Sequence, residues 1–364
     1  MQNIRGSSSG PERVDTAIIG AGQAGLALGY HLAQRGADFV LLEGSDRVGS
    51  AWRSRYDSLR LFTPARYSSL PGLPFPGDPD AYPVRDAVAD YLERYAAHFT
   101  LPVRLAQPVT RLTQADSGLR LETPQGELLA RRVVVCTGPF GRPWRPAFAA
   151  DLDPEVAQMH AADYRNPAQV PPDPVLVVGA GNSGAWIASE LARTHRVSLA
   201  LGHMPRSLPQ RLLGRDLFWW LERLGLERVA PDSALGQRLR RQEPLIGLGV
   251  RDLARRGVEV LPRVVGVSGR EVQFAQGTAR RFAGVLWATG YRPEYGWLET
   301  PVLDATGAVV HRGGLSAVPG LAFLGLSWQR SRYSALLGGV GRDASWLLKQ
   351  LERGRAAPGR PNGG

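Results

Sequence analysis

The chain has 364 residues, of which 43% are apolar and nine are tryptophan, and its formal net charge is +11. This composition favours a globular protein of two domains. Because no apolar run approaches the roughly 20 residues of a membrane span and no signal peptide is visible, we expect a cytoplasmic protein without stable membrane insertion. The basic residues are scattered and match no nucleic-acid-binding module, so the charge predicts no nucleic-acid partner.

The first predicted unit is a βαβ motif over residues 15–43, after a polar segment, 1–13, that we expect to be a disordered leader. A strand leads into the turn Gly20-Ala21-Gly22-Gln23-Ala24-Gly25, and a helical pattern follows. Glycines at this spacing let the backbone approach a pyrophosphate at the positive end of the helix. Glu43 stands about 20 residues on, where an acid binds a ribose hydroxyl. The turn predicts a dinucleotide site, with simple helix packing as the alternative.

A loop-rich segment, 48–82, dense in proline, glycine, tyrosine and arginine, follows this unit. Loops of this length in compact domains tend to be functional. A helix over 84–97 and short strands over 101–105, 109–113 and 119–123 come next, before the run that ends at Cys136-Thr137-Gly138. Cys136 is the sole cysteine, so neither an intrachain disulfide nor a C-x-x-C redox pair can form.

A second glycine turn, Gly179-Ala180-Gly181-Asn182-Ser183-Gly184, again lies between a strand and a helix, within residues 175–194. One chain with two such turns is predicted to bind two dinucleotides. After the strand 197–201 comes an irregular insertion, 205–256, in which residues 212–224 have a helical pattern rich in aromatic side chains. That helix is interpreted as a lid, as a patch for a membrane surface or a second subunit, or as an amphipathic helix packed on its own domain.

Strands return at 258–261, 264–268 and 271–274, and the run 285–293 ends in Ala288-Thr289-Gly290-Tyr291-Arg292-Pro293. We predict an α/β fold with two Rossmann-like dinucleotide-binding domains, the nicotinamide domain being inserted in the flavin domain. The predicted boundaries are 14–156 and 289–351 for the FAD-binding domain, 157–288 for the NAD(P)H-binding domain, and 352–364 for a flexible tail.

The order of these motifs resembles the flavin-containing monooxygenases, above all their short bacterial and plant auxin-synthesis-like branch. The resemblance covers roughly residues 14–350, and the hexapeptide 288–293 is its most specific part. It implies FAD at the first turn with Glu43 on the adenosine ribose, Trp52 beside the flavin, and Val109 against the adenine. It implies NADPH or NADH at the second turn. The cofactor-binding residues so expected are Gly20, Gly22, Gln23, Ala24, Gly25, Glu43, Trp52, Val109, Thr137, Gly138, Gly179, Gly181, Asn182, Ser183, Gly184, His203, Arg206, Thr289, Gly290 and Gly325.

The chemistry that the resemblance implies is carried by the cofactors. Reduced nicotinamide passes a hydride to the flavin, O2 adds to the reduced ring, and a C4a-hydroperoxyflavin gives one oxygen atom to a small soft nucleophile, through sulfur or amine nitrogen. No acid-base pair or metal is required, and the six histidines show no metal-ligand spacing.

Three positions depart from the family pattern. Only the second half of the monooxygenase fingerprint is present, from His160 to Tyr164, and His160 is interpreted either as part of it or as a structural residue between domains. Gly202 stands where NADPH enzymes of the family place arginine, with His203 and Arg206 able to compensate in part, which predicts use of both NADPH and NADH.

Phe62 stands where the family has an asparagine that faces the flavin, and it is the one candidate catalytic position; core packing is its alternative role. An apolar ring cannot donate the hydrogen bond of an asparagine. An NAD(P)H oxidase or flavin reductase that releases peroxide is therefore the first alternative function. A redox-sensing flavoprotein linked to transport is the second. The substrate's identity and a possible homodimer stay open.

Overall fold

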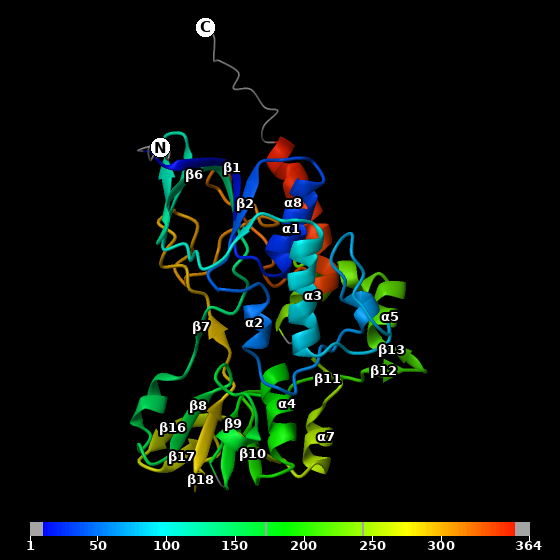
Figure 1. The fold of residues 1–364 in the computed structure, drawn as a ribbon. Helices are drawn as coiled ribbons and strands as arrows, with labels where there is room; N and C mark the ends of the chain where they lie inside the picture. Colours follow the sequence, from blue (N-terminus) through cyan, green and yellow to red (C-terminus); the bar gives the residue numbers. More distant parts are fainter. Residues whose placement is uncertain (1–9, 172, 242–243, 354–364) are drawn as a thin grey trace, which may run out of the picture.

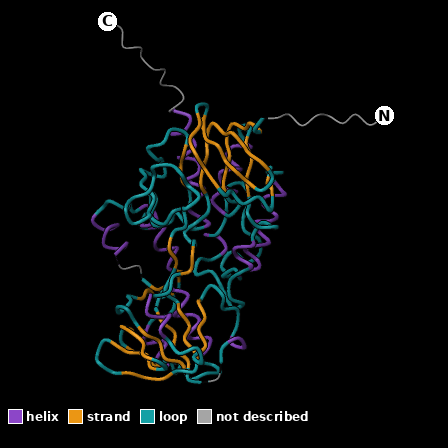
Figure 2. Tube along the Cα trace, turned by 90° about the vertical axis from the view of Figure 1, so that its left-hand side faces the viewer, coloured by secondary structure: helices purple, strands orange, loops and turns teal. Residues whose placement is uncertain are grey.

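The computed structural model describes residues 10–171, 173–241 and 244–353. Two sheet-based units lie one above the other, joined by crossing segments near β7 (Arg142–Pro143) and β20 (Tyr291–Arg292) (Figure 1). We call them the first unit, at the top of that view, and the second unit, at the bottom. The tube in Figure 2 shows the same two layers of strands separated by a loop-rich middle.

The first unit is built on a seven-stranded sheet in the order β3-β2-β1-β6-β5-β4, with β21 also paired to β6. Its strands are β1 (Glu12–Ile19), β2 (Phe39–Leu42), β3 (Val103–Arg104), β4 (Arg111–Ala115), β5 (Gly118–Thr123), β6 (Gly126–Val135) and β21 (Leu321–Phe323). β1 pairs with β2 and β6 in parallel, whereas β5 pairs antiparallel with β4 and β6. The carboxyl ends of β1 and β6 therefore meet at one edge, where the first glycine turn begins.

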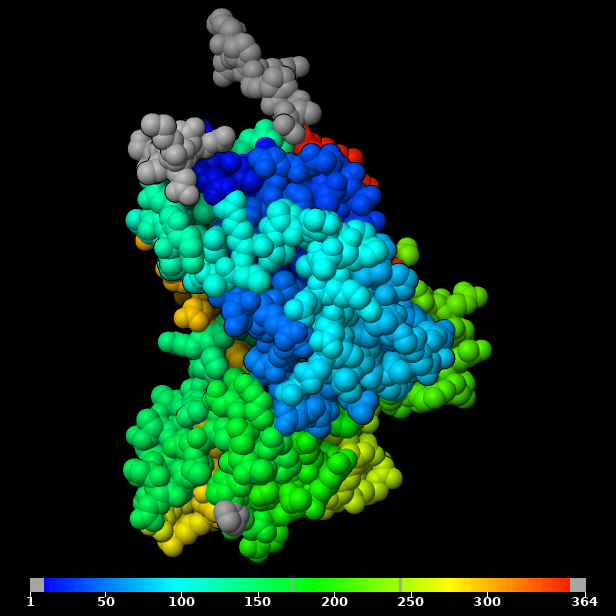
Figure 3. Space-filling view, viewed as in Figure 1, coloured from blue at the N-terminus to red at the C-terminus, as the bar shows by residue number. Residues whose placement is uncertain are grey.

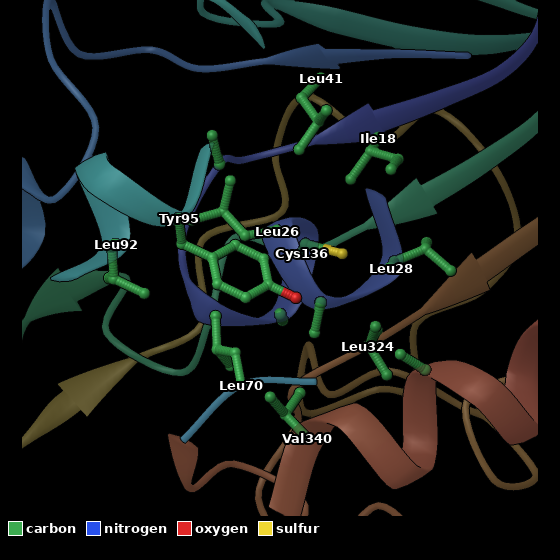
Figure 4. Close-up of a cluster of buried hydrophobic side chains, with 14 of the residues drawn as sticks. Ile18, Leu26, Leu28, Leu41, Leu70, Leu92, Tyr95, Cys136, Leu324 and Val340 are labelled. Atoms are coloured by element: carbon green, nitrogen blue, oxygen red, sulfur yellow. The ribbon is translucent and has the colours of Figure 1, made fainter. Parts of the chain in front are cut away.

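Three helices cover one face of this sheet: α1 (Gln23–Ala33), α3 (Arg85–His98) and α8 (Leu337–Arg353). Their apolar faces enclose a core in which Ile18, Leu26 and Val340 are wholly buried (Figure 4). Cys136 lies within the same core. Segment 295–318 packs on the other face, in a second core to which β4 and β5 of the same sheet also contribute. Helix α1, which begins at the first glycine turn, thus packs against both α3 and α8.

The second unit has a parallel five-stranded sheet in the order β15-β10-β9-β19-β8. The strands are β8 (Ala157–His160), β9 (Val175–Val178), β10 (Val197–Ala200), β15 (Glu259–Leu261) and β19 (Gly284–Trp287). Helices α4 (Asn182–Leu191) and α7 (Val250–Arg255) cover one face. An antiparallel sheet of β16 (Val264–Ser268), β17 (Glu271–Phe274) and β18 (Ala279–Arg281) covers the other. In both units helices cover one face of parallel strands, and antiparallel strands are added within the same sheet in the first unit and as a separate sheet in the second.

The insertion after β10 consists of short elements. They are β11 (Ser207–Leu208), β12 (Arg211–Leu212), β13 (Arg215–Asp216), α5 (Leu217–Arg223), a 3-10 turn (Leu226–Arg228), α6 (Ala234–Arg241) and β14 (Leu245–Ile246). The helix predicted over 212–224 is wrong in its first part, because residues 211–216 form the hairpin β12-β13 around Gly214, whose φ is +76°. Leu217, Phe218 and Leu221 of α5 pack against residues 62, 67, 333 and 336 of the first unit.

The packing also differs from the predicted boundaries. Residues of the 3-10 turn Ala147–Asp151, together with Leu152 and Val156, share a core with β16 and β17, so the second unit begins about ten residues before 157. β1 begins at Glu12, within the predicted leader, and α8 runs to Arg353, within the predicted tail. Residues 1–9 and 354–364 of those two predictions lie outside the described residues.

The loop-rich segment 48–82 begins with α2 (Ser50–Arg53) and includes a 3-10 turn (Ala65–Tyr67), so it is less irregular than predicted. Just after α2, Tyr56 inserts into the second unit, where it is 7% exposed and contacts the ring of Tyr164 at 6.3 Å between centroids. The backbone amide of Asp57 donates to the carbonyl of Arg165 at 2.7 Å. This segment therefore fixes the second unit against the first.

Candidate cofactor sites at two glycine turns

The first glycine of each turn has a conformation that other residues rarely adopt. Gly20 has φ +99° and Gly179 has φ +105°. A Cβ on Gly20 would lie 2.9 Å from the carbonyl oxygen of Cys136, and one on Gly179 would lie 2.5 Å from that of Ala288. Both positions therefore require glycine, because the backbone is left-handed and the neighbouring strand is too close.

The remaining glycines divide into packed and open positions. A Cβ on Gly25 would lie 2.0 Å from the oxygen of Gly20, and one on Gly184 would lie 1.9 Å from that of Gly179. By contrast, a Cβ on Gly22 or Gly181 would meet no atom within 4 Å. Gly22 and Gly181 are also the N-caps of α1 and α4, and neither helix has a side-chain cap.

These features leave backbone N–H groups at two helix N-termini facing open space. Such termini attract phosphate through N–H donors and the helix dipole. The opposite wall of each opening is formed by Thr137-Gly138 after β6 and by Thr289-Gly290 after β19. Gly138 and Gly290 have φ +75° and +84°, and both again face open space. Each turn thus forms a cradle that a dinucleotide pyrophosphate fits.

The surroundings of the first turn contain the predicted acid. Glu43 follows β2, and its carboxylate accepts hydrogen bonds from the amides of Ala21 at 2.8 Å and Ser45 at 3.0 Å. Val109 lies in the loop before β4, which begins at Arg111, so the strand predicted over 109–113 starts two residues late. The amide of Gln107 in that loop donates to the carbonyl of Glu43 at 2.8 Å. The loop therefore lies beside the acid although Val109 is not in a strand.

On the other side of the turn, Gln23 joins three distant segments. Its side-chain oxygen accepts from Trp52 Nε1 at 3.2 Å, and its Nε2 donates to the carbonyl of Ala335 at 3.3 Å. A Cβ on Gly325, after β21, would lie 2.8 Å from Cβ of Ala24, so this segment also passes close to α1. The structure thus brings Gln23, Ala24, Trp52 and Gly325 together at the start of α1.

Next to Ala335 lies a group of packed aromatic rings that we call the aromatic cluster: Phe62, Tyr67, Phe218 and Tyr333. Phe62 stacks on Phe218 with centroids 5.9 Å apart and planes 14° apart, and Tyr333 meets Phe218 edge-on at 5.9 Å. Burial raises the pKa of Tyr67 and of Tyr333, so both phenols stay protonated near neutral pH. Phe62 therefore has packing contacts, and its catalytic role stays a prediction.

At the second turn, Asn182 and Ser183 are exposed at the first residues of α4. Gly202, His203 and Arg206 follow β10 and are exposed as well, and a Cβ on Gly202 would meet no atom within 4 Å. Among the described residues, no carboxylate pairs with His203 or Arg206 within 4.0 Å. These three positions can all be reached by a ligand at the edge of β10.

His160 lies where the two units meet, at the end of β8. The amide of Ala162 donates to its Nδ1 at 3.0 Å, and its Nε2 contacts the carbonyl of Gly290 at 3.1 Å. Both contacts suit the neutral ring that carries its proton on Nε2. Burial lowers the pKa of His160. These contacts favour the structural interpretation of this histidine over a part in catalysis.

The motifs did not reveal an arginine that joins the segments around His160. Arg55, after α2, donates to the hydroxyl of Tyr291 at 2.8 Å and places its guanidinium 4.3 Å from the ring centroid of Phe140. Gln210 was also missed, although its Nε2 donates to the carbonyl of Phe62 at 2.9 Å. The abundance of arginine and tyrosine in segment 48–82 was the one sequence signal for such contacts. No periodicity in the sequence relates these residues to partners more than 100 positions away.

Comparisons with known proteins agree with this duplicated architecture. The model of the pyridine nucleotide-disulphide oxidoreductase family matches residues 17–210. An uncharacterized CzcO-like oxidoreductase of Geobacillus kaustophilus is 44% identical over 341 residues, covering 93% of this chain and 98% of that protein. An indole-3-pyruvate monooxygenase of the YUCCA type from Oryza sativa is 32% identical, covering 83% of this chain and 82% of that one.

Among solved structures, a flavin-containing monooxygenase from Stenotrophomonas maltophilia superposes with a TM-score of 0.81 at 31% identity, over 95% of this chain and 100% of that one. No group of three or more His, Cys, Asp or Glu side chains suited to a metal ion occurs in the part of the chain that the structure describes. None of its described helices is long and apolar enough to cross a bilayer.

Proposed function

Because the chain belongs to the flavin monooxygenases of the pyridine nucleotide-disulphide oxidoreductase family, an FAD-dependent enzyme class that uses NADPH and O2, we propose that it oxygenates a small substrate at sulfur or amine nitrogen. The two glycine turns support the binding of a different cofactor by each unit. We assign FAD to the first turn and the nicotinamide cofactor to the second.

Several contacts support FAD at the first turn. Gly22 and Gly138 leave room for a pyrophosphate in front of α1. Glu43 lies beside the loop that contains Val109, as an acid on the adenosine ribose would. Gln23 and Trp52 are hydrogen-bonded to each other and lie on the side of Ala335 and the aromatic cluster, where the flavin ring would extend. Gly325 and Thr137 border the same opening.

At the second turn, Gly181 and Gly290 provide the matching space, with Asn182, Ser183 and Thr289 around it. Gly202 offers no side chain to a 2′-phosphate. Arg206 and His203 are exposed near it and can contact a phosphate without the fixed bidentate geometry of an arginine at 202. We therefore propose that NADH is accepted as well as NADPH.

When bound, FAD supplies the two-electron chemistry that couples NADPH oxidation to O2 activation. The residues of this chain would position the cofactors and the substrate and exclude water. Phe62 and Phe218 stack face to face, and we place them on the substrate side of the proposed flavin position. An apolar wall at this place keeps water from a reactive centre. Gln210 fixes the backbone of Phe62 through its carbonyl.

The observation that carries the substrate class is the composition of the aromatic cluster. Its members are two phenylalanines and two tyrosines whose phenols stay protonated, so the cluster itself supplies no base to deprotonate a substrate. A sulfide, or an amine in its neutral form, has a lone pair that attacks without losing a proton first. A soft nucleophile therefore suits this wall better than an alcohol or a carbon acid.

The test is a coupled assay of the FAD-loaded protein with methyl phenyl sulfide. We would measure NADPH oxidised, sulfoxide formed and hydrogen peroxide released at rising sulfide concentration. Oxygenation predicts that sulfoxide rises as peroxide falls while the sum of the two matches NADPH oxidised. Peroxide equal to NADPH at every concentration, with a tertiary amine giving the same result, would exclude the proposal.

The position of Phe62 supports an NAD(P)H oxidase as the second candidate. Its ring cannot donate the hydrogen bond that an asparagine there would offer. The variant Phe62→Asn, with Phe148→Asn as a substitution in the second unit, separates the two functions. If the wild type is an oxidase because of this position, product per NADPH rises in Phe62→Asn and not in Phe148→Asn. A redox-sensing flavoprotein remains a third candidate, and slow turnover with either nicotinamide cofactor would favour it.

A further inference from the structure

The insertion presents apolar side chains to solvent that the fold does not require. Ten large apolar side chains of the described residues are exposed, and five of them lie in residues 204–235. Leu213, at the tip of the hairpin β12-β13, is 82% exposed and has φ +49°. A leucine with a left-handed backbone and no packing partner is costly on both counts. The folded chain gains nothing from leucine at this position.

The exposed side chains of the hairpin continue onto α5. Trp220 Nε1 donates to the carbonyl of Leu212 at 2.9 Å, which holds the hairpin against the outer face of the helix. Leu224 is 65% exposed and lies one turn after Trp220, so the two share a face. We call Leu212, Leu213, Trp220 and Leu224 the apolar tip. The lobe that carries it projects from the side of the molecule (Figure 3).

Arginines surround the apolar tip. Arg211 and Arg215 flank the turn, and Arg223 lies on the outer face of α5; all three are exposed. Within the described residues, none of them has a carboxylate at 4.0 Å or less. Two acids lie among them: Asp216, next to Arg215, accepts hydrogen bonds from Tyr82, Gln210 and the amide of Phe218, and Glu222, next to Arg223, is exposed. The flank therefore carries three arginines against two carboxylates, and its net charge is positive.

We propose that the apolar tip and its arginines are a docking surface for an anionic phospholipid bilayer. Leucine and tryptophan enter the interfacial region of a bilayer, and arginines beside them bind acidic headgroups. Because the described helices include none that can span a bilayer, this contact is peripheral. The inference is independent of the substrate and would hold for an oxidase as well.

Two properties of the surface favour lipid over a protein partner. A stable protein interface buries about 800 Å² on each side, and a projecting hairpin beside a two-turn helix offers little flat area. A second copy of the chain would also bring three arginines toward the same three, and like charges at close range oppose association. A bilayer accepts a projecting tip without shape complementarity.

The test is vesicle flotation of the full-length, FAD-loaded protein. Vesicles of phosphatidylcholine alone are compared with vesicles of phosphatidylcholine and phosphatidylglycerol, at low and high salt. The proposal predicts binding to the mixed vesicles that weakens at high salt, because exposed charges are screened. Failure to bind the mixed vesicles at low salt, or equal binding to both kinds of vesicle, would overturn it.

Two variants with matched controls locate the surface. Leu213→Gly removes the most exposed side chain of the apolar tip while suiting a positive φ, so the fold is kept, and it should weaken binding about tenfold. Arg211→Gln with Arg215→Gln should weaken binding on the order of thirtyfold. The controls Val310→Ser and Arg193→Gln with Arg263→Gln remove an exposed valine and two exposed arginines elsewhere and should leave binding unchanged.

Sedimentation velocity on the same variants tests whether a second copy of the chain, and not lipid, covers this surface. A monomer, or a dimer that Leu213→Gly leaves intact, is expected. If the wild type is a dimer that Leu213→Gly dissociates, the second copy is the occupant and the lipid proposal is wrong. Equal vesicle binding by Leu213→Gly and the wild type would likewise contradict it.

Discussion

The Cβ position of Gly25 lies 2.0 Å from the carbonyl oxygen of Gly20, whereas the Cβ position of Gly22, between them, faces open space. One turn thus contains glycines needed by the fold and a glycine left free for a ligand. The second turn repeats this pattern with Gly184, Gly179 and Gly181. The repetition lets stability and cofactor binding be tested separately.

Gly22→Ala should fold normally and lose FAD. Gly22 has φ −75°, which alanine tolerates, but the added methyl group enters the proposed phosphate space. Loss of one backbone hydrogen bond to a charged group costs about 1.5–3 kcal/mol, or roughly ten- to hundredfold in affinity. Gly181→Ala should keep FAD and raise KM for NADPH by a similar factor. Flavin content by absorbance and steady-state kinetics give both values; equal flavin loss in the two variants would contradict the assignment.

Gly25→Ala is the structural counterpart of these variants. Its methyl group would collide with backbone, so we expect unfolding or poor expression rather than a specific loss of cofactor. Thermal denaturation followed by circular dichroism separates this result from that of Gly22→Ala.

Gly202→Arg should increase the preference for NADPH over NADH. The site has room for a side chain, and a bidentate guanidinium-phosphate contact is worth about 1.5–3 kcal/mol, which is roughly ten- to hundredfold in the ratio of kcat/KM values. Gly296→Arg, at an equally open position in the first unit, is the control for added charge. An unchanged ratio in Gly202→Arg would show that the 2′-phosphate lies elsewhere.

Stability should fall as the pH drops below about 6.5, the ordinary pKa of histidine. The pKa of His160 is lowered by burial, and Ala162 donates to its Nδ1, so the folded state favours the neutral ring. A group of this kind stabilises fully above its unfolded pKa and loses that contribution as the pH falls through its folded pKa. His160→Gln should be less stable near pH 7.5, by about 1–3 kcal/mol.

The difference between His160→Gln and the wild type should shrink near pH 5.5, as urea denaturation at the two pH values would show. Part of the pH dependence should persist in the variant, because burial also lowers the pKa of His31 and His311. A difference that stays constant between the two pH values would mean that His160 does not titrate in this range.

Cys136→Ala should retain full NADPH oxidation. The thiol is 5% exposed in the core behind the first turn, and burial raises its pKa, so it is neither accessible nor ionised. We expect a stability loss of about 1 kcal/mol for the smaller side chain. Loss of NADPH oxidation in a variant that still binds FAD would imply thiol chemistry and would return the disulfide reductases of the same family to consideration.

The sequence predicted the parts of this molecule whose causes are local. The strand, the glycine spacing and the following helical pattern all lie within residues 15–43, so the pattern from Gly20 to Glu43 was sufficient to predict β1, α1 and β2, although Gly20 also lies against Cys136. The same holds for 175–201. The family resemblance added FAD and the nicotinamide cofactor, and the comparisons confirm membership of the family.

The parts that were missed depend on contacts between distant segments. Phe62 stacks on a ring 156 positions later (218 − 62), and no period in either segment encodes that pairing. The sequence pattern predicts a helix at Leu212 and Leu213, which lie in a hairpin, because apolar spacing alone cannot distinguish an exposed hairpin from the buried face of a helix. The early start of the second unit escaped notice because Ala149 and Leu152 pack on strands that come more than 100 residues later.

The insertion of Tyr56 into the second unit limits how this protein can be recombined with its relatives. A chimera that exchanges residues 147–288 as a block would leave Tyr56 behind, and its ring belongs among Tyr164, Val175 and Ala185 of the exchanged block. Such a hybrid combines the Tyr56 side chain of one parent with the surrounding core residues of the other. Cofactor specificity can be moved between relatives as a module only when residues 55–59 travel with it.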